Sequence, residues 1–274
     1  MGVPGAQSIR VGDIDIRASI KGRGLPLLMM NGLGGSLGVL APLQDALPDF
    51  RTIVFDPPGV GRSTPLQFPI RLPAHADYVA KLLDTLCLDQ VDVFGVSWGG
   101  ALAQEFTHRH GDRVRRLILT STTPGPGLIA SPEVYWAFFD ISPRDAKAYK
   151  EKVAPVLFGG KARHDAEALF ETGVFRHLTK KTTAAYYFQM AAAAGWTSLP
   201  YLWTLKHETL VLTGDDDPLV RPYNSRLIHL LKPNSELKIL EGEGHFMIVS
   251  SATELADHIR EFLNRGQAKL RLVA

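Results

Sequence analysis

A serine lies between two glycines in the stretch Gly95-Val96-Ser97-Trp98-Gly99, where an apolar run gives way to a helix-like pattern. A sharp turn from strand to helix leaves little room for side chains beside the serine, which accounts for the glycines. Such a turn exposes the hydroxyl and places the backbone N–H of Trp98 beside a reacting carbonyl group. The pattern therefore predicts Ser97 as a nucleophile, while an ordinary glycine-rich turn with an idle serine is the alternative for the motif alone.

A serine hydroxyl needs a base to remove its proton, and a histidine base needs a carboxylate to fix its tautomer. When the serine sits on a turn of this kind, the acid and then the histidine follow it along the chain. Two later stretches fit that order because each follows a strand-like run: 214–218, which holds consecutive aspartates, and 242–246, which holds His245. Since the carboxyl ends of parallel strands share one edge of a sheet, we expect Ser97, an aspartate and His245 to meet there.

The aspartates Asp215, Asp216 and Asp217 are consecutive, so they cannot all point at one imidazole, and ionised neighbours repel one another. Asp217 is predicted as the catalytic acid because it stands three residues after the glycine that ends the strand, the usual spacing for this role. We expect Asp215 and Asp216 to cap the following turn or to face solvent. The predicted catalytic triad is therefore Ser97, Asp217 and His245.

Stabilising the oxyanion formed during ester hydrolysis needs a second backbone N–H besides that of Trp98. The stretch Asn31-Gly32-Leu33-Gly34 follows a short apolar strand, and the N–H of Leu33 is the predicted second donor. We expect Asn31 to support this loop structurally. Residues 56–63 lack the Lys-Ser/Thr ending of a phosphate-binding loop, and we interpret them as a rigid turn at the edge of the site.

The overall composition points away from nucleic acids and membranes. The 30 basic and 28 acidic residues are mixed along the chain and leave a formal charge of +2, so no nucleic-acid partner is predicted. The basic stretch 113–116 is interpreted as a solvated turn. No apolar run reaches the roughly 20 residues of a membrane span. No signal peptide is recognised at the N-terminus either, so we expect a cytoplasmic protein.

The chain holds one cysteine, Cys87, which excludes an internal disulfide framework and does not resemble a metal cluster. We expect Cys87 on a helix face shortly before a strand. The eight histidines other than His245 fall in helix-like or polar stretches and are expected mostly at the surface. No metal or other cofactor is predicted, and the sequence makes no prediction about the oligomeric state.

Strand-like and helix-like runs alternate along the chain, which is typical of parallel β-α-β units. The predicted strands are 8–11 and 14–20, which form a hairpin, and then 27–30, 51–55, 91–96, 114–120, 209–213 and 236–240. The spacing of apolar residues predicts helices over 74–88, 98–110 and 252–263. The predicted fold class is α/β, with a mostly parallel sheet and helices on both faces.

Between residues 124 and 205 the alternation breaks, and helix-like segments rich in aromatic residues replace the strands. We expect a helical cap (lid) over residues 124–205, inserted into a core domain made of residues 1–123 and 206–274. Such a cap would cover the carboxyl edge of the sheet, where ligands bind in open α/β folds. Most of its aromatic side chains are expected to pack cap against core. The candidates for a substrate pocket are Trp136, Tyr187, Trp196 and Phe246.

Beyond these motifs, the sequence resembles the bacterial intracellular medium-chain-length polyhydroxyalkanoate depolymerases, which are serine hydrolases of the α/β-hydrolase fold. The likeness extends over about residues 10–265. The stretches that carry it are GVSWGGALAQ at 95–104, GWTS at 195–198 and GDDDPL at 214–219, together with NGLG at 31–34. The match at 195–198 is the most specific of these, because it lies outside the catalytic motifs.

This resemblance maps the family's triad onto Ser97, Asp217 and His245. It implies a hydrophobic ester as substrate, a polyester of 3-hydroxy fatty acids, and a polymer granule surface as a partner. Residues 124–179 match the family only loosely, so a preference for one acyl chain length is not implied.

Other functions of the same fold stay open at this point. A small-molecule carboxylesterase, a carbon–carbon bond hydrolase and a perhydrolase would all use the same triad. A non-enzymatic ligand receptor or granule-bound scaffold is a further alternative, which an intact triad argues against. Relatives that use an aspartate nucleophile are excluded because position 97 is serine.

Overall fold

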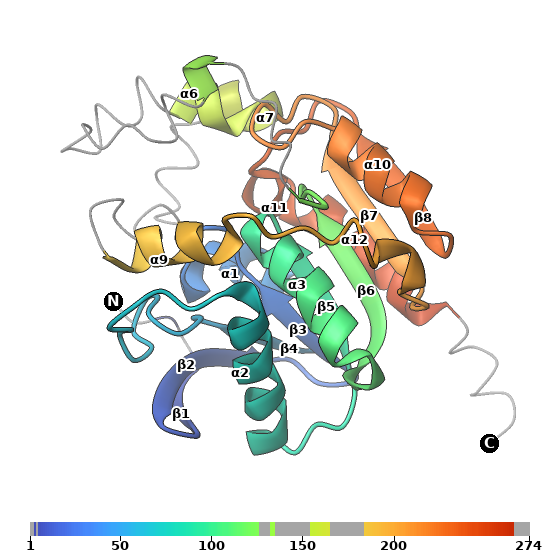
Figure 1. Cartoon of the computed structure of the whole chain (residues 1–274). Helices are drawn as coiled ribbons and strands as arrows, with labels where there is room; N and C mark the ends of the chain where they lie inside the picture. The colour runs from blue at the N-terminus through green and yellow to red at the C-terminus, as the bar shows by residue number, and fades with distance from the viewer. Residues whose placement is uncertain (1–2, 4, 126–131, 135–153, 165–183, 266–274) are drawn as a thin grey trace, which may run out of the picture.

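The computed structural model describes residues 3, 5–125, 132–134, 154–164 and 184–265 (Figure 1). The described strands are β1 (Ala6–Val11), β2 (Ile14–Lys21), β3 (Pro26–Met30), β4 (Arg51–Phe55), β5 (Val91–Val96), β6 (Val114–Thr120), β7 (Thr209–Gly214) and β8 (Ser235–Leu240). They form one eight-stranded sheet in the order β1-β2-β4-β3-β5-β6-β7-β8. The hairpin β1-β2 and the pair β2-β4 are antiparallel, and all other pairs are parallel. The predicted mostly parallel sheet is confirmed.

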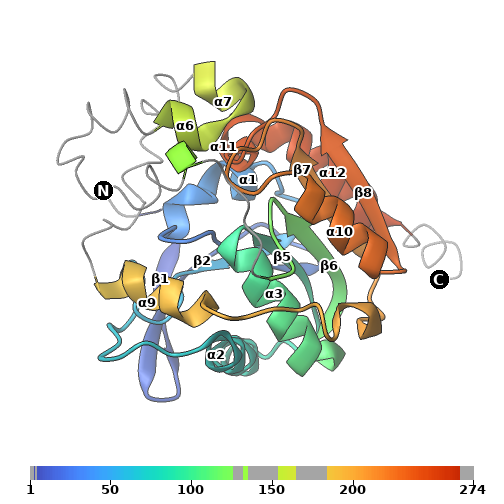
Figure 2. The ribbon, with the colours of Figure 1, turned by 45° about the horizontal axis from the view of Figure 1, so that its top comes forward.

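Helices cover both faces of this sheet (Figure 2). One face carries α2 (Leu72–Thr85), α3 (Trp98–Arg109) and α10 (Tyr223–Leu231), and the other carries α1 (Ala41–Asp45), α11 (Met247–Ser250) and α12 (Ala252–Asn264). Alternate side chains of a strand point to opposite faces. In β3, Leu28 and Met30 accordingly join the first core, and Leu27 and Met29 join the second. Because both faces are covered, β5 and β7 are buried along their whole length, as expected of central parallel strands.

Helix α2 ends earlier than the sequence pattern predicts. Its last residue is Thr85, and Cys87 lies beyond it with a φ of 53°. A left-handed backbone cannot continue an α-helix, so Cys87 starts the turn into β5. The expectation that Cys87 lies on a helix face was therefore wrong, and its side chain is exposed.

The basic stretch 113–116 is not a solvated turn. Arg115 and Arg116 both belong to β6, and Arg115 pairs with the buried carboxylate of Asp92. Arg116 donates to two main-chain oxygens in the last turn of α12. Carbonyl groups there lack helical partners, so this arginine caps the helix and ties it to the sheet.

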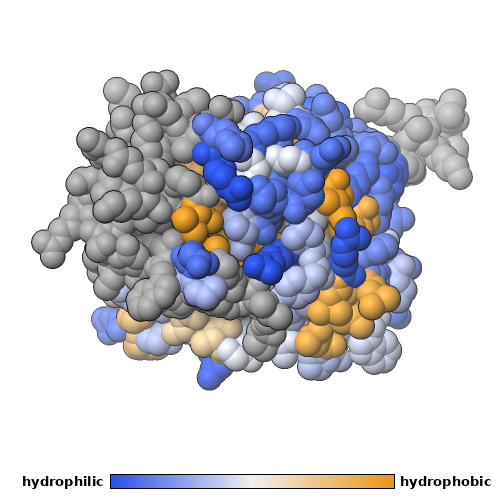
Figure 3. Space-filling view, turned by 90° about the horizontal axis from the view of Figure 1, so that it is seen from above, coloured by the Kyte–Doolittle hydropathy of each residue, from blue (hydrophilic) through white to orange (hydrophobic). Residues whose placement is uncertain are grey.

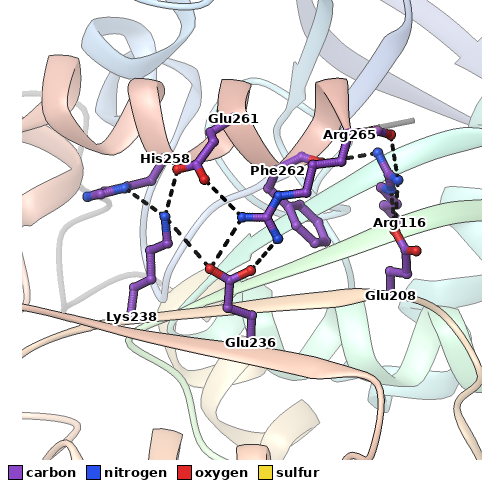
Figure 4. Close-up of polar contacts among 8 residues, drawn as sticks. All are labelled: Arg116, Glu208, Glu236, Lys238, His258, Glu261, Phe262 and Arg265. Atoms are coloured by element: carbon purple, nitrogen blue, oxygen red, sulfur yellow. Dashed lines mark hydrogen bonds and ion pairs between the residues drawn. The ribbon is translucent and has the colours of Figure 1, made fainter. Parts of the chain in front are cut away.

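An ion-pair network fastens the end of α12 to β8 (Figure 4). Arg265 pairs with Glu236 of β8 and with Glu261, and Lys238 of β8 pairs with Glu261 at 2.8 Å. The guanidinium group of Arg265 also lies 5.8 Å from the ring centre of Phe262. Each exposed pair contributes at most about 1 kcal/mol to stability, so the helix depends mainly on its buried apolar face.

Between β6 and β7 the named elements are all helices: α6 (Ala154–Phe158), α7 (Gly160–His164), α9 (Ala184–Ala193) and the short 3-10 helix η5 (Leu202–Thr204). Helix α9 lies beside the start of α3, and α6 and α7 lie near α11 (Figure 1). Seen from above, this end of the molecule shows hydrophobic residues in separate patches among hydrophilic ones (Figure 3). No residue described between 124 and 205 belongs to a strand, in keeping with a helical insertion. Among the described helices, none is long and apolar enough to cross a membrane.

Candidate active site

Ser97 is the residue at which β5 passes into α3, and its backbone is strained. Its φ of 55° and ψ of −120° lie in a region that residues with a side chain rarely adopt. Two glycines make the turn possible. A Cβ added to Gly95 would lie 2.4 Å from the main-chain oxygen of Gly99, and one added to Gly99 would lie 2.2 Å from that of Met30. Only glycine fits at these positions.

The end of strand β6 and the residues just after it hold this strained turn in place. The N–H of Ser97 donates to the main-chain oxygen of Thr120 at 3.0 Å. The hydroxyl of Thr122 donates to the main-chain oxygen of Ser97 at 2.7 Å. A Cβ added to Gly100 would lie 2.5 Å from the Cβ of Thr122, so a third glycine is required for this approach. A strained backbone of this kind persists only where the surrounding structure fixes it, and such residues gather at functional sites.

His245 and Asp217 are both buried and are hydrogen-bonded to each other, Nδ1 to Oδ2 at 2.9 Å. The other carboxylate oxygen of Asp217 accepts hydrogen bonds from the N–H groups of Leu219 and Val220. An ionised carboxylate only accepts hydrogen bonds, so the neutral imidazole carries its proton on Nδ1 and keeps a lone pair on Nε2. This is the geometry of a general base with its orienting acid.

The two aspartates before Asp217 have other partners. Asp215 accepts a hydrogen bond from the N–H of Gly242 at 2.8 Å, which joins the loops after β7 and β8. Asp216 accepts one from the N–H of Gly160 at 2.8 Å and forms an ion pair with Arg163. Both carboxylates lie on exposed residues, and each one fastens a neighbouring segment rather than the imidazole.

The segment 158–163, where α6 gives way to α7, lies directly on the loop that carries His245. The main-chain oxygen of Phe158 accepts a hydrogen bond from the N–H of His245 at 2.7 Å. The backbones are in close contact, because a Cβ added to Gly160 would lie 2.4 Å from the carbonyl carbon of Glu243. Part of the segment expected to form the cap therefore fixes the position of the histidine loop.

Lys161 adds a charged contact between the same two segments. Its N–H donates to the main-chain oxygen of Gly242 at 2.8 Å, and its Nζ lies 2.6 Å from Oε1 of Glu243. The side chain of Glu243 is fully buried and also accepts a hydrogen bond from the hydroxyl of Ser251 at 2.6 Å. A buried carboxylate is tolerated only when it is paired in this way.

The stretch 31–34 passes beside Ser97. A Cβ added to Gly32 would lie 3.3 Å from the Cβ of Ser97. Asn31 is buried, and its Nδ2 donates to the main-chain oxygen of Ser36 at 3.1 Å, which closes the loop. Asn31 thus has the structural role that the sequence suggests.

Leu33 and Trp98 lie on the two segments that flank Ser97. Within the described part of the chain, neither backbone N–H donates to another residue, so both remain available to an oxyanion. The indole Nε1 of Trp98 donates to the main-chain oxygen of Gln189 in α9 at 2.9 Å. The ring of His75 meets the same indole edge-on, with 5.4 Å between ring centres.

The aromatic pocket candidates have different surroundings. Phe246 packs against Phe158, with 4.4 Å between ring centres, and its ring lies 5.9 Å from that of His245. Tyr187 is 46% exposed, on the solvent side of α9. Trp136 lies outside the described residues.

Trp196 contacts the middle of α3. Its indole Nε1 donates to Oε2 of Glu105 at 2.9 Å, and the hydroxyl of Tyr201 donates to the same oxygen at 2.9 Å. Glu105 is buried and lies about 12 Å along the helix axis from Ser97, at a rise of about 1.5 Å per residue. This arrangement favours packing of cap against core over contact with a substrate at Ser97.

Two buried ionisable groups near the site have shifted pKa values. Burial lowers the pKa of His75 from 6.5 to about 4, so its imidazole stays neutral. Burial also raises the pKa of Asp56 to about 6, although the N–H groups of Leu37 and Arg62 donate to its carboxylate. These hydrogen bonds fix the turn over 56–63. The described residues hold no group of three or more side chains suited to a metal ion.

Gln189, Lys161 and His75 shape the site and belong to no sequence motif. Glu243 lies within the stretch 242–246, but its ion pair with Lys161 was not predicted. Their roles come from contacts between segments distant in sequence, which local patterns do not encode. One signal was present in the sequence, the pair Gly159-Gly160, since glycines inside a helical stretch often have a packing reason such as a close backbone approach. His75 departs from the expectation that the remaining histidines lie mostly at the surface.

Comparison with known proteins agrees with this architecture. The family model of the α/β hydrolase fold matches residues 26–252. A poly(3-hydroxyalkanoate) depolymerase from Ectopseudomonas oleovorans is 39% identical over 251 residues, which cover 89% of this chain and 86% of the relative.

Solved structures of low sequence identity show the same fold. A thermophilic esterase from Thermogutta terrifontis superposes with a TM-score of 0.80 at 24% identity, covering 95% of this chain and 98% of that chain. A meta-cleavage product hydrolase from Pseudomonas fluorescens gives a TM-score of 0.80 at 19% identity, covering 94% and 97%.

The family match extends from β3 to the start of α12, and the resemblance to polyhydroxyalkanoate depolymerases is confirmed by the 39% identity. The chain therefore belongs to the α/β hydrolase family, in the group that includes the poly(3-hydroxyalkanoate) depolymerase it matches.

Proposed function

We propose that this chain hydrolyses poly(3-hydroxyalkanoate) at its ester bonds, with Ser97 as nucleophile, His245 as base and Asp217 as acid. The observation that carries the choice of substrate is the 39% identity over 251 residues with a depolymerase of that polymer. The strained backbone of Ser97 and the hydrogen bond between His245 and Asp217 support the chemistry.

In the first half of the proposed reaction, Nε2 of His245 takes the proton of Ser97 Oγ as this oxygen attacks the ester carbonyl carbon. The carbonyl oxygen becomes an oxyanion, which the N–H groups of Leu33 and Trp98 stabilise. The ester C–O bond then breaks, and His245 returns its proton to the departing alkoxide, releasing an alcohol. Asp217 stays ionised and stabilises the imidazolium throughout.

In the second half, water attacks the carbonyl carbon of the acyl-enzyme. His245 accepts a proton from this water and passes it to Ser97 Oγ as the acyl bond breaks. The products are a carboxylic acid and the free enzyme, so the reaction requires no cofactor.

The segment 124–205 is proposed as a cap whose underside binds the acyl chain. Phe246 supports this placement, because it follows His245 in the chain and its ring packs against that of Phe158 in the segment, with 4.4 Å between ring centres. Tyr187 is not proposed for this surface, because its side chain is 46% exposed on α9, and Trp136 lies outside the described residues. We also propose a polymer granule as the surface on which the enzyme acts, and the cytoplasm as its location, as the family resemblance implies.

A second candidate function is hydrolysis of a carbon–carbon bond. The observation that favours it is a sequence relative, a 2-hydroxymuconate semialdehyde hydrolase from a Pseudomonas strain, which is 24% identical over 263 residues and 90% of this chain. This identity is well below the 39% shared with the depolymerase.

The test uses the purified full chain with p-nitrophenyl esters from acetate to dodecanoate and with a suspension of medium-chain poly(3-hydroxyalkanoate). Each methylene buried in an apolar channel contributes about 0.8 kcal/mol, which corresponds to about a fourfold rise in kcat/KM per carbon until the channel fills. We expect a maximum at medium chain length and release of 3-hydroxy acids from the polymer. Ser97→Ala serves as the control and should release none.

A profile that peaks at acetate, with no hydroxy acid released, would contradict the choice of polymer and leave a small-ester hydrolase. Cleavage of a meta-cleavage product without ester turnover would favour the second candidate.

A further inference from the structure

Gln189, on α9, connects the two segments that are proposed to form the oxyanion hole. Its main-chain oxygen accepts a hydrogen bond from the indole of Trp98, the residue after Ser97, at 2.9 Å. Its side-chain Oε1 accepts one from the N–H of Gly34, the residue after Leu33, at 2.9 Å. Gln189, one buried residue of the segment proposed as the cap, thus forms hydrogen bonds with both of the segments that flank Ser97.

The other end of this amide has no partner. Gln189 is 2% exposed, and its Nε2 forms no hydrogen bond within the described part of the structure. The bond from Gly34 fixes which end of the amide is oxygen, because a backbone N–H can only donate. Nε2 therefore presents buried N–H donors that lack an acceptor among the described residues.

Gln189 is one of eight buried side chains in the described part of the structure with an unpartnered polar atom, and it differs in this from the two other buried glutamines. Gln44 and Gln104 are also buried, and in each one Nε2 donates to two main-chain oxygens. A buried donor without an acceptor lowers stability, so a native structure that keeps one requires an explanation. A substrate oxygen that binds at this position provides one.

The position of Nε2 limits which substrate atom it can reach. Nε2 and Oε1 of Gln189 are attached to the same carbon atom. Oε1 accepts a hydrogen bond from the N–H of Gly34, and this N–H lies one peptide unit along the chain from the N–H of Leu33. In the proposed mechanism the ester carbonyl oxygen lies against Leu33. In a 3-hydroxyalkanoate the carbon two positions along the acyl chain from the carbonyl carbon carries an oxygen, which is the acyl-chain acceptor nearest to a carbonyl group held at Leu33.

We propose that Gln189 Nε2 donates a hydrogen bond to the oxygen on the third carbon of the acyl group. This inference rests on the proposed ester hydrolysis and specifies which acyl groups the same site prefers. The oxygen is a hydroxyl at a chain end and an ester oxygen within the polymer, and both accept hydrogen bonds. Gln189 then distinguishes 3-hydroxyacyl esters from plain fatty acyl esters of equal length.

The experiment compares p-nitrophenyl 3-hydroxyoctanoate with the octanoate and the 3-methyloctanoate, a similar shape without the acceptor. A site that bonds a substrate oxygen discriminates against analogues that lack it, so wild-type kcat/KM should favour the 3-hydroxy ester by about tenfold or more. This comparison needs no variant and does not depend on the folding of one.

Gln189→Met keeps the length of the side chain and removes its donors. We expect the preference for the 3-hydroxy ester to fall to within about twofold, so that this ester loses far more activity than octanoate. Gln44→Met is the matched control, since it removes a buried and fully bonded amide on the opposite side of the sheet. It should keep the wild-type ratio whatever its effect on stability.

Equal losses on both esters in Gln189→Met would overturn the proposal and leave Gln189 as a positioning residue of the oxyanion loop. Absence of any preference in the wild type would also overturn it and would assign Nε2 to a buried water. In both of these outcomes the wild-type protein still hydrolyses the esters. If the wild-type protein hydrolysed none of them, the proposed function itself would be overturned.

Discussion

The imidazole of His245 is bonded to Asp217 at 2.9 Å, while the adjacent carboxylate of Asp216 is bonded to the N–H of Gly160 at 2.8 Å. Neighbouring residues of one turn therefore serve different segments. One orients the proposed base, and the other holds the segment 158–163 against the histidine loop. This division makes their roles separable by substitution.

Asp217→Asn should lower kcat by about 10³- to 10⁴-fold, because an amide in place of the carboxylate favours the wrong tautomer of His245. Asp216→Asn should lower kcat by less than about tenfold, since its carboxylate does not contact the imidazole. Steady-state kinetics on one ester, with thermal melts to confirm folding, measures both. The reverse ranking would transfer the role of acid to Asp216.

Lys161→Met should lower the free energy of unfolding by about 1 to 2 kcal/mol and reduce kcat/KM. The buried carboxylate of Glu243 would keep only hydroxyl partners, although the exposure of Lys161 limits the effect. Arg163→Met is the control, because it removes an exposed pair with Asp216 and should cost less than about 0.5 kcal/mol. Urea unfolding measures both variants, and equal effects would contradict a special role for the buried carboxylate.

His75 should make the protein less stable in mild acid. Its pKa is about 4 in the folded state and 6.5 as the ordinary value, so between these values the unfolded chain binds more protons. The contribution of His75 to stability is therefore fully present above pH 6.5 and is lost as the pH falls towards 4. At pH 5 the stability lost is about 2 kcal/mol.

His75→Phe keeps an aromatic ring beside Trp98 and removes the titrating group. Urea unfolding at pH 7 and pH 5 should show a smaller difference in the variant than in the wild type, by about that amount. An identical difference in the two proteins would show that other groups control the acid sensitivity.

Trp196→Phe should destabilise the protein by about 1 to 2 kcal/mol and leave the acyl chain-length profile unchanged. The carboxylate of Glu105 would lose the indole of Trp196 as a hydrogen-bond donor and would keep the hydroxyl of Tyr201 as its other donor. The measurement pairs urea unfolding with the ester series from acetate to dodecanoate. A shifted profile would instead support Trp196 as a wall of the pocket, as the sequence suggested.

Much of the fold could be predicted because its signals are local. Continuous apolar runs at 91–96 and 209–213 correspond to the doubly buried strands β5 and β7. Gly12 and Asp13 separate two alternating runs and form the expected hairpin turn. The order of the serine, aspartate and histidine stretches, each after a strand, was enough to predict that they share one edge of the sheet.

Other features depend on tertiary contacts or local backbone conformation and could not be predicted. Helix α10 (Tyr223–Leu231) has only nine residues, between Pro222 and Lys232, and a run this short does not distinguish a helix from a strand by its apolar spacing. The end of α2 depends on the left-handed backbone at Cys87, which a residue other than glycine rarely adopts. The bonds of Gln189 to Gly34 and Trp98 join residues 155 and 91 positions apart.

The central claim is that Ser97 is a nucleophile activated by His245. The most direct test is reaction of the full chain with a fluorophosphonate, followed by mass spectrometry of the intact protein and of its peptides. We expect one label per chain on the peptide that contains Ser97, none in Ser97→Ala, and strongly slowed labelling in His245→Gln. Labelling of another residue at the wild-type rate, or a Ser97→Ala variant that still hydrolyses esters at the wild-type rate, would contradict the account.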